Sequence, residues 1–192
     1  MKFTLLATLL PATAFAQSQA VFDRATPVRF EGAGCPTSSP GIPPPTATFT
    51  PDNRAVTINY PAYNVTWPGP GQDKPCNVFF NILWPTGCTN LAVSPTNQGQ
   101  TSNFSSGVRG TFRRTYDVQE ARPGQATFNN SFTTNQPFRF GDRFVVRRTT
   151  AAGQNVRPFV FRSRLTLEGQ NNAQTGNLRL NFTTISLSST SC

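Results

Sequence analysis

Arginine is the side chain of this sequence best suited to holding a charged ligand. Two arginines stand two positions apart in the segment FVFRSRLTLE, residues 159–168. The segment alternates with a period of two, which predicts a β-strand with one apolar face and one face carrying Arg162 and Arg164. A guanidinium group is planar and forms paired hydrogen bonds with carboxylate, sulfate or phosphate. The segment therefore indicates a strand that presents a candidate anion contact.

Positive charge is concentrated in the second half of the chain. Residues 107–192 carry twelve arginines, no lysine and four acids, a net charge of +8, whereas residues 17–106 are neutral. Some of the arginines lie opposite the apolar positions of their predicted strands: Arg113, Arg162, Arg164 and Arg179. One hypothesis is that these four bind an anionic polysaccharide or another anionic cell-surface component. A face that is only solvated is the favoured interpretation.

Residue types that commonly carry catalysis are scarce. The chain has no histidine, which excludes histidine-based triads, histidine general bases and histidine-ligated metals. Asp117 and Glu168 are candidates for a carboxylate pair, although an ion pair with a neighbouring arginine is the favoured interpretation of Asp117. We therefore expect no catalytic residue, no metal and no cofactor. A glycan-active hydrolase is the alternative, and nucleic acid is not an expected partner.

The N-terminus has the features of a secretory signal peptide. Lys2 precedes the apolar run FTLLATLL, and Ala14-Phe15-Ala16 forms a cleavage site, so residues 1–16 are predicted to be removed. No later segment is apolar for long enough to span a membrane. We expect a secreted, extracellular monomer without a transmembrane segment.

Four cysteines predict two disulfides in an oxidising compartment: Cys35, Cys76, Cys88 and Cys192. Three pairings are open. Cys76–Cys88 is the least compatible, because residues 77–84 look extended and carry the chain about 26 Å away. The preference is for Cys35–Cys88 together with Cys76–Cys192. A zinc site lacks both the paired cysteine spacing and histidine.

Four N-glycosylation sequons stand in the chain, at Asn64, Asn103, Asn129 and Asn181. Asn129 follows Phe128, and Asn181 lies between Leu180 and Phe182. If the aromatic rings point inward, both asparagines point outward, as a glycan requires. The sequons therefore predict a eukaryotic secreted glycoprotein.

Composition predicts an all-β fold. The chain contains 17 Pro, 14 Gly and 17 Phe, which suit turns and strands, and only 13% of its residues are charged. About nine strands are predicted, at 46–50, 54–60, 64–67, 76–84, 107–118, 125–132, 142–150, 157–168 and 177–187. They predict a single antiparallel β-sandwich over 46–192, with a barrel as the alternative and residues 17–45 as an extended Pro-rich arm.

Finer features of the strands follow from their spacing. Residues 94–106 are predicted to form an exposed loop. The last two strands, joined by a polar Gly/Asn turn, are expected to pair as a hairpin, which would place Arg162, Arg164 and Arg179 on one face. The apolar positions of the last strand change phase near residues 183–184, which predicts a β-bulge.

The order of several short motifs resembles a known family. These motifs are GCP at residues 34–36, a strand that begins at Cys76 and ends in PTG at 85–87, RG at 109–110 and the C-terminal Cys192. Together they resemble small secreted fungal proteins known only as a domain of unknown function, over roughly residues 34–192. The resemblance implies a secreted β-rich fungal protein and supplies no catalytic residues.

These observations favour a secreted, non-enzymatic, disulfide-stabilised β-sandwich that acts at an extracellular surface, either a cell wall or the host apoplast. Its arginine face would bind anionic glycans. A fungal effector or elicitor without glycan binding and a structural component of a wall or spore coat are the alternatives.

Overall fold

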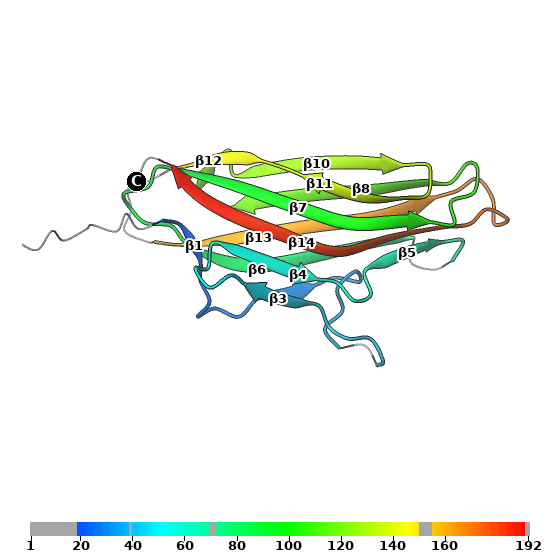
Figure 1. Ribbon diagram of the computed structural model, residues 1–192, viewed down its shortest axis with the longest axis horizontal. Helices are drawn as coiled ribbons and strands as arrows, with labels where there is room; N and C mark the ends of the chain where they lie inside the picture. Colours follow the sequence, from blue (N-terminus) through cyan, green and yellow to red (C-terminus); the bar gives the residue numbers. More distant parts are fainter. Residues whose placement is uncertain (1–18, 39, 70–71, 150–154, 191–192) are drawn as a thin grey trace, which may run out of the picture.

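The computed structural model describes residues 19–38, 40–69, 72–149 and 155–190, and these form two antiparallel β-sheets packed face to face (Figure 1). The predicted all-β sandwich is confirmed, with fourteen strands rather than nine. No helix in the described residues is long and apolar enough to cross a membrane. The predicted signal peptide, residues 1–16, and Cys192 lie outside the described residues.

Sheet A has six strands in the order β1-β6-β13-β8-β10, and β2 also pairs with β6. Its strands are β1 (Val21–Phe22), β2 (Arg29–Glu31), β6 (Asp73–Leu83), β8 (Arg109–Val118), β10 (Gln125–Phe132) and β13 (Val156–Glu168). The short strands β1 and β2 fall within the predicted Pro-rich arm, so part of that arm belongs to the sandwich.

Sheet B has eight strands in the order β3-β4-β14-β7-β12-β9, with β5 on β14 and β11 on β7. Its strands are β3 (Thr46–Phe49), β4 (Ala55–Asn59), β5 (Asn64–Trp67), β7 (Asn90–Ser102), β9 (Ala121–Arg122), β11 (Gln136–Gly141), β12 (Phe144–Arg148) and β14 (Gly176–Thr190). β11 and β12 pair with successive parts of β7.

A single aromatic-rich core fills the space between the two sheets. Phe159, Phe161, Leu165 and Leu167 are all at most 1% exposed, as the alternation of their strand predicts. Tyr116 of β8 stacks on Phe161 with ring centroids 5.0 Å apart. The period-two pattern therefore assigned the inner face of β13 correctly, because that assignment needs only local geometry.

The predicted exposed loop at 94–106 is wrong over most of its length, because residues 90–102 form the long central strand β7. Polar side chains of β7 point into the sandwich, where they form hydrogen bonds. Thr101 donates a hydrogen bond to the carbonyl of Thr134 and accepts one from the amide of Gln136. A buried polar strand of this kind lacks the apolar alternation by which strands are recognised in sequence.

The predicted hairpin between the last two strands is also wrong. β13 pairs with β6 and β8 in sheet A, whereas β14 pairs with β7, β4 and β5 in sheet B. Residues 169–175 cross from one sheet to the other, and β14 lies in front of β13 in Figure 1. The predicted bulge in β14 is confirmed, but it lies at Asn181, between Leu180 and Phe182, rather than at 183–184.

One disulfide joins Cys35 to Cys76, with Cα atoms 5.3 Å apart. This pairing contradicts the preferred Cys35–Cys88 and Cys76–Cys192 bridges. The reason is that β2 pairs with β6, where Glu31 lies opposite Asn77. The amide of Gly34 then donates to the carbonyl of Pro75, which keeps Cys35 beside the neighbouring position on β6. Cys88 is buried and is not a free thiol.

All three tyrosines of the chain are buried, and burial is the main cause that raises the pKa of each: Tyr60, Tyr63 and Tyr116. A pKa raised in the folded state contributes stability that is complete below the unfolded pKa near 10 and is lost as the pH rises above it.

We therefore predict that the native protein shows no tyrosinate ultraviolet absorbance as the pH passes about 10. The absorbance should appear together with loss of the circular dichroism signal at higher pH. A tyrosine that titrates while the fold is intact would show that its ring is in contact with water.

Candidate functional site

The outer face of sheet A brings three of the four predicted arginines together. Arg164 of β13 lies directly opposite Arg113 of β8, and Arg162 lies opposite Thr115 on the same face. All three side chains are exposed. These three arginines therefore share one surface formed by the adjacent strands β8 and β13.

Carboxylates neutralise two of these arginines. Arg162 Nη1 donates to Asp117 Oδ2 at 3.0 Å, and the guanidinium of Arg164 forms a two-pronged pair with the Asp73 carboxylate. Among the described residues, no carboxylate lies within 4 Å of Arg113. The face thus carries donors and acceptors side by side, and the ion pair favoured for Asp117 from the sequence is formed with Arg162.

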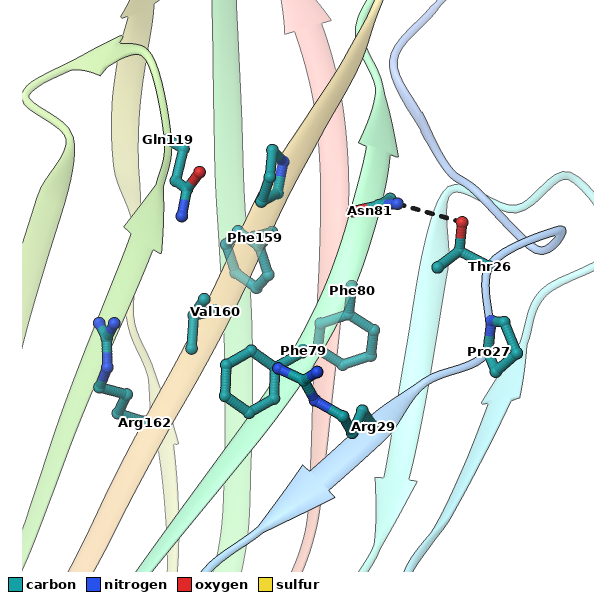
Figure 2. A pocket seen from close by; sticks show the side chains of 11 residues that line it. Thr26, Pro27, Arg29, Phe79, Phe80, Asn81, Gln119, Phe159, Val160 and Arg162 are labelled. Carbon is teal, nitrogen blue, oxygen red and sulfur yellow. Dashed lines mark hydrogen bonds between the residues drawn. The ribbon is translucent and has the colours of Figure 1, made fainter.

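Two open grooves cross this face and meet at Arg162. The first has a volume of about 420 Å³ and the second about 480 Å³. In the first, Figure 2 shows side chains that come from β2, β6, β13 and the turn after β8, with Val160 between Arg162 and Phe79 in that view. The lining of the second includes Arg113, Arg164, Asn77 and Gln125. The two grooves together form a path across sheet A.

The first groove has an apolar floor with a polar rim. Phe79 and Val160 lie opposite each other on β6 and β13, and the guanidinium of Arg29 stacks 4.3 Å from the centre of the Phe79 ring (Figure 2). On the rim, the Asn81 amide donates to the Thr26 hydroxyl at 3.1 Å. The alternation of Asn77, Phe79 and Asn81 on β6 produces this pattern, because every second residue points outward.

Arg179 lies on the other sheet, so the expected cluster of four arginines is not formed. Its cross-strand neighbours are Asn64 and Gln100, and its Nη2 donates to the carbonyl of Pro61 at 3.1 Å. Asn181, at the bulge of β14, lines two further open depressions on sheet B. The bulge turns Phe182 toward the outer face, where the ring is half-buried.

The sequon asparagines lie at different places on the surface. Asn103 and Asn129 are exposed, whereas Asn64 and Asn181 are half-buried. Asn129 is the cross-strand neighbour of Arg113, so a glycan on Asn129 would stand beside the second groove of sheet A.

The acids proposed as a catalytic pair are far apart. Asp117 lies opposite Val160, eight residues along β13 from Glu168, which corresponds to about 26 Å. A glycosidase needs its two carboxylates within about 10 Å of each other. Asp73 lies nearer to Glu168, but it pairs with Arg164. Neither Asp73 nor Glu168 lines the two grooves of sheet A or the two depressions of sheet B. In the part of the chain that the structure describes, no group of three acids or cysteines could hold a metal ion.

Sequence reasoning missed a buried ion pair between the sheets. Arg114 Nε donates to Asp142 Oδ2 at 2.7 Å, and both residues are buried. The Tyr116 hydroxyl donates to the same oxygen at 2.9 Å, and Asn97 links the carboxylate to Thr183 of β14. A signal was present, because Arg114 shares the inward parity of Phe112 and Tyr116.

The fold and the grooves define an antiparallel β-sandwich with polar grooves on its outer sheet faces. The chain belongs to the family described as a domain of unknown function (DUF4360), whose model matches residues 24–191. This confirms the family resemblance that the motifs indicated. The search of curated proteins found no match.

Six chains of solved structures match. One is described as TmCBM61 in complex with beta-1,4-galactotriose. It is similar over 86% of this chain and 90% of that chain, with 10% sequence identity and a TM-score of 0.39. At this level the similarity does not indicate what the present chain binds.

Proposed function

We propose that this protein is a secreted, non-catalytic β-sandwich that binds polysaccharide at an extracellular surface. The grooves that meet at Arg162 on sheet A form the binding site. The observation that carries the proposal is the composition of this path, an apolar floor beside paired charges and amides.

Sugar rings present apolar C–H faces and polar hydroxyl edges. Phe79 and Val160 supply apolar surface, and the amides of Asn77, Asn81 and Gln125 can each donate and accept hydrogen bonds. The Arg162–Asp117 pair offers both a donor and an acceptor without net charge. These groups suit a neutral polysaccharide better than the polyanion expected from the sequence.

Two observations support an extracellular location. The chain forms a disulfide between Cys35 and Cys76, and disulfides persist in oxidising compartments. The sequon residues Asn103 and Asn129 are exposed, as glycosylation requires. The separation of Asp117 and Glu168 supports binding without hydrolysis by this pair.

The test is co-sedimentation with insoluble neutral polysaccharides: cellulose, chitin, β-1,3-glucan and mannan. We expect the wild-type protein to sediment with at least one of them, and the double variant Phe79→Ser/Arg162→Ser to bind it at least about tenfold more weakly. The variant removes the apolar floor and the charge that joins the two grooves.

The matched control is Phe182→Ser/Arg179→Ser, which removes the same two residue types from the outer face of sheet B. We expect it to bind like the wild type. An equal loss in both double variants, or release of reducing sugar by the wild type, would contradict the proposal.

A further inference from the structure

The edge of sheet B carries an exposed group of arginines, here called the edge arginines: Arg122 on β9, Arg139 on β11, Arg143 between β11 and β12, and Arg147 on β12. Arg139 lies opposite Gln98 and Arg147 opposite Asn90 on the same strand, β7. Eight residues of an extended strand span about 26 Å, so the edge arginines extend over that length.

Among the described residues, no carboxylate forms an ion pair with an edge arginine. None of the eight strands of sheet B, within the bounds that the structure describes, contains Asp or Glu. Asp142, next to Arg143, is buried and bound to Arg114. Glu120, two residues from Arg122, pairs with Arg157 at 3.1 Å. Sheet A differs, because its exposed Arg162 and Arg164 each have an acid partner.

Two of the edge arginines face each other. Arg147 and Arg122 are direct cross-strand partners, and both are exposed. Like charges directly opposite each other on a sheet destabilise it. An anion placed between the two guanidinium groups would remove this repulsion and accept hydrogen bonds from both.

We propose that the edge arginines bind an acidic polysaccharide, one whose sugars carry carboxylate or sulfate groups. A single small anion can meet only the Arg122–Arg147 pair, whereas a polymer with repeated negative charges also reaches Arg139 and Arg143. Arginine without lysine suits such groups, because its fork binds them through two hydrogen bonds. This site lies on sheet B, so it does not depend on the grooves of sheet A.

The test is binding to polygalacturonate, which carries carboxylates, and to dextran sulfate, with uncharged dextran as the reference. We expect the protein to bind at least one of the two polyanions but not dextran, and the affinity to fall steeply with added salt as screening increases. The triple variant Arg139→Ser/Arg143→Ser/Arg147→Ser should bind at least about tenfold more weakly than the wild type.

The matched control is Arg109→Ser/Arg113→Ser/Arg162→Ser, which removes the same three charges from sheet A. We expect it to retain affinity within about threefold. Equal losses in both triple variants would show that only net charge matters and would overturn the site, as would absence of polyanion binding by the wild type. Tighter binding to RNA or to anionic vesicles, lost in the sheet B triple variant, would overturn the polysaccharide as the ligand.

The two proposals fail separately. Loss of neutral polysaccharide binding in the Phe79→Ser/Arg162→Ser variant tests the grooves of sheet A, and the sheet B triple variant should leave that binding unchanged. Because all the substituted arginines are exposed, we expect both triple variants to fold. Their melting temperatures check this.

Discussion

Replacing Asp142 with alanine is expected to destabilise the protein by about 3–5 kcal/mol, because it leaves the Arg114 guanidinium buried without its counter-charge. The Arg114 side chain is 2% exposed and that of Asp142 is 6% exposed. Arg114 donates to both carboxylate oxygens of Asp142, and its other partners are Asn130 Oδ1 at 2.6 Å and the carbonyl of Phe112 at 3.4 Å. Water cannot easily replace the lost contacts in this part of the sandwich.

The substitution also weakens the connection between the two sheets. The Asp142 carboxylate accepts hydrogen bonds from Tyr116 of β8 in sheet A and from Asn97 of β7 in sheet B. Without it, the Tyr116 hydroxyl loses its buried acceptor, which adds a cost of about 1–3 kcal/mol for an unsatisfied polar group. This cost overlaps with the first one, because the groups belong to one network.

Denaturant unfolding of Asp142→Ala and of the wild type measures this effect. The control is Asp117→Ala, which breaks the partly exposed pair with Arg162 and should cost no more than about 1 kcal/mol. The double variant Arg114→Met/Asp142→Ala should regain part of the loss, since apolar side chains can replace a buried ion pair. A loss below about 1 kcal/mol in Asp142→Ala would show that the pair is hydrated.

The second large effect concerns the bridge between Cys35 and Cys76. Their sequence separation is 41, and closing a loop of this length in the unfolded chain contributes about 4 kcal/mol. The double variant Cys35→Ser/Cys76→Ser should lose about this amount of stability. Removing both cysteines together avoids leaving one reactive thiol in the core.

Removal of the disulfide should also weaken ligand binding in the first groove of sheet A. The bridge fixes the segment that carries β2, and Arg29 of β2 stacks on Phe79 in the first groove. We therefore expect the same double variant to bind neutral polysaccharide more weakly, even below its unfolding temperature. Peptide mapping of the unreduced wild-type protein should recover Cys35 linked to Cys76, and a Cys35–Cys88 peptide would contradict this account.

Local alternation in the sequence predicted which residues of a strand point inward, as Phe159 and Phe161 demonstrate. It could not predict which sheet a strand joins, because that depends on pairing between segments far apart in the chain. For this reason the expected β13–β14 hairpin placed Arg179 beside Arg162, whereas the two residues lie on opposite sheets. Arg113 lies beside Arg164 because both point outward from the adjacent strands β8 and β13, a pairing that no local pattern indicated.

Polar residues inside the sandwich were the main source of error. β7 looked like a loop because Asn97 and Thr101 occupy inward positions, where hydrogen bonds satisfy them. Arg114 looked like another surface arginine, although its parity was that of Phe112 and Tyr116. Burial of such groups depends on partners such as Asp142 and Thr134, which no local pattern identifies.

Binding of a neutral polysaccharide in the grooves of sheet A is the central proposed property of this protein. Mapping of backbone amide chemical shifts tests this most directly, with a soluble oligosaccharide prepared from the polysaccharide that retains the protein. We predict shifts on β6, β13 and the turn between β8 and β9, around Phe79, Val160 and Gln119, and none on β7 or β14. Shifts confined to sheet B, or no shifts at saturating oligosaccharide, would contradict the account.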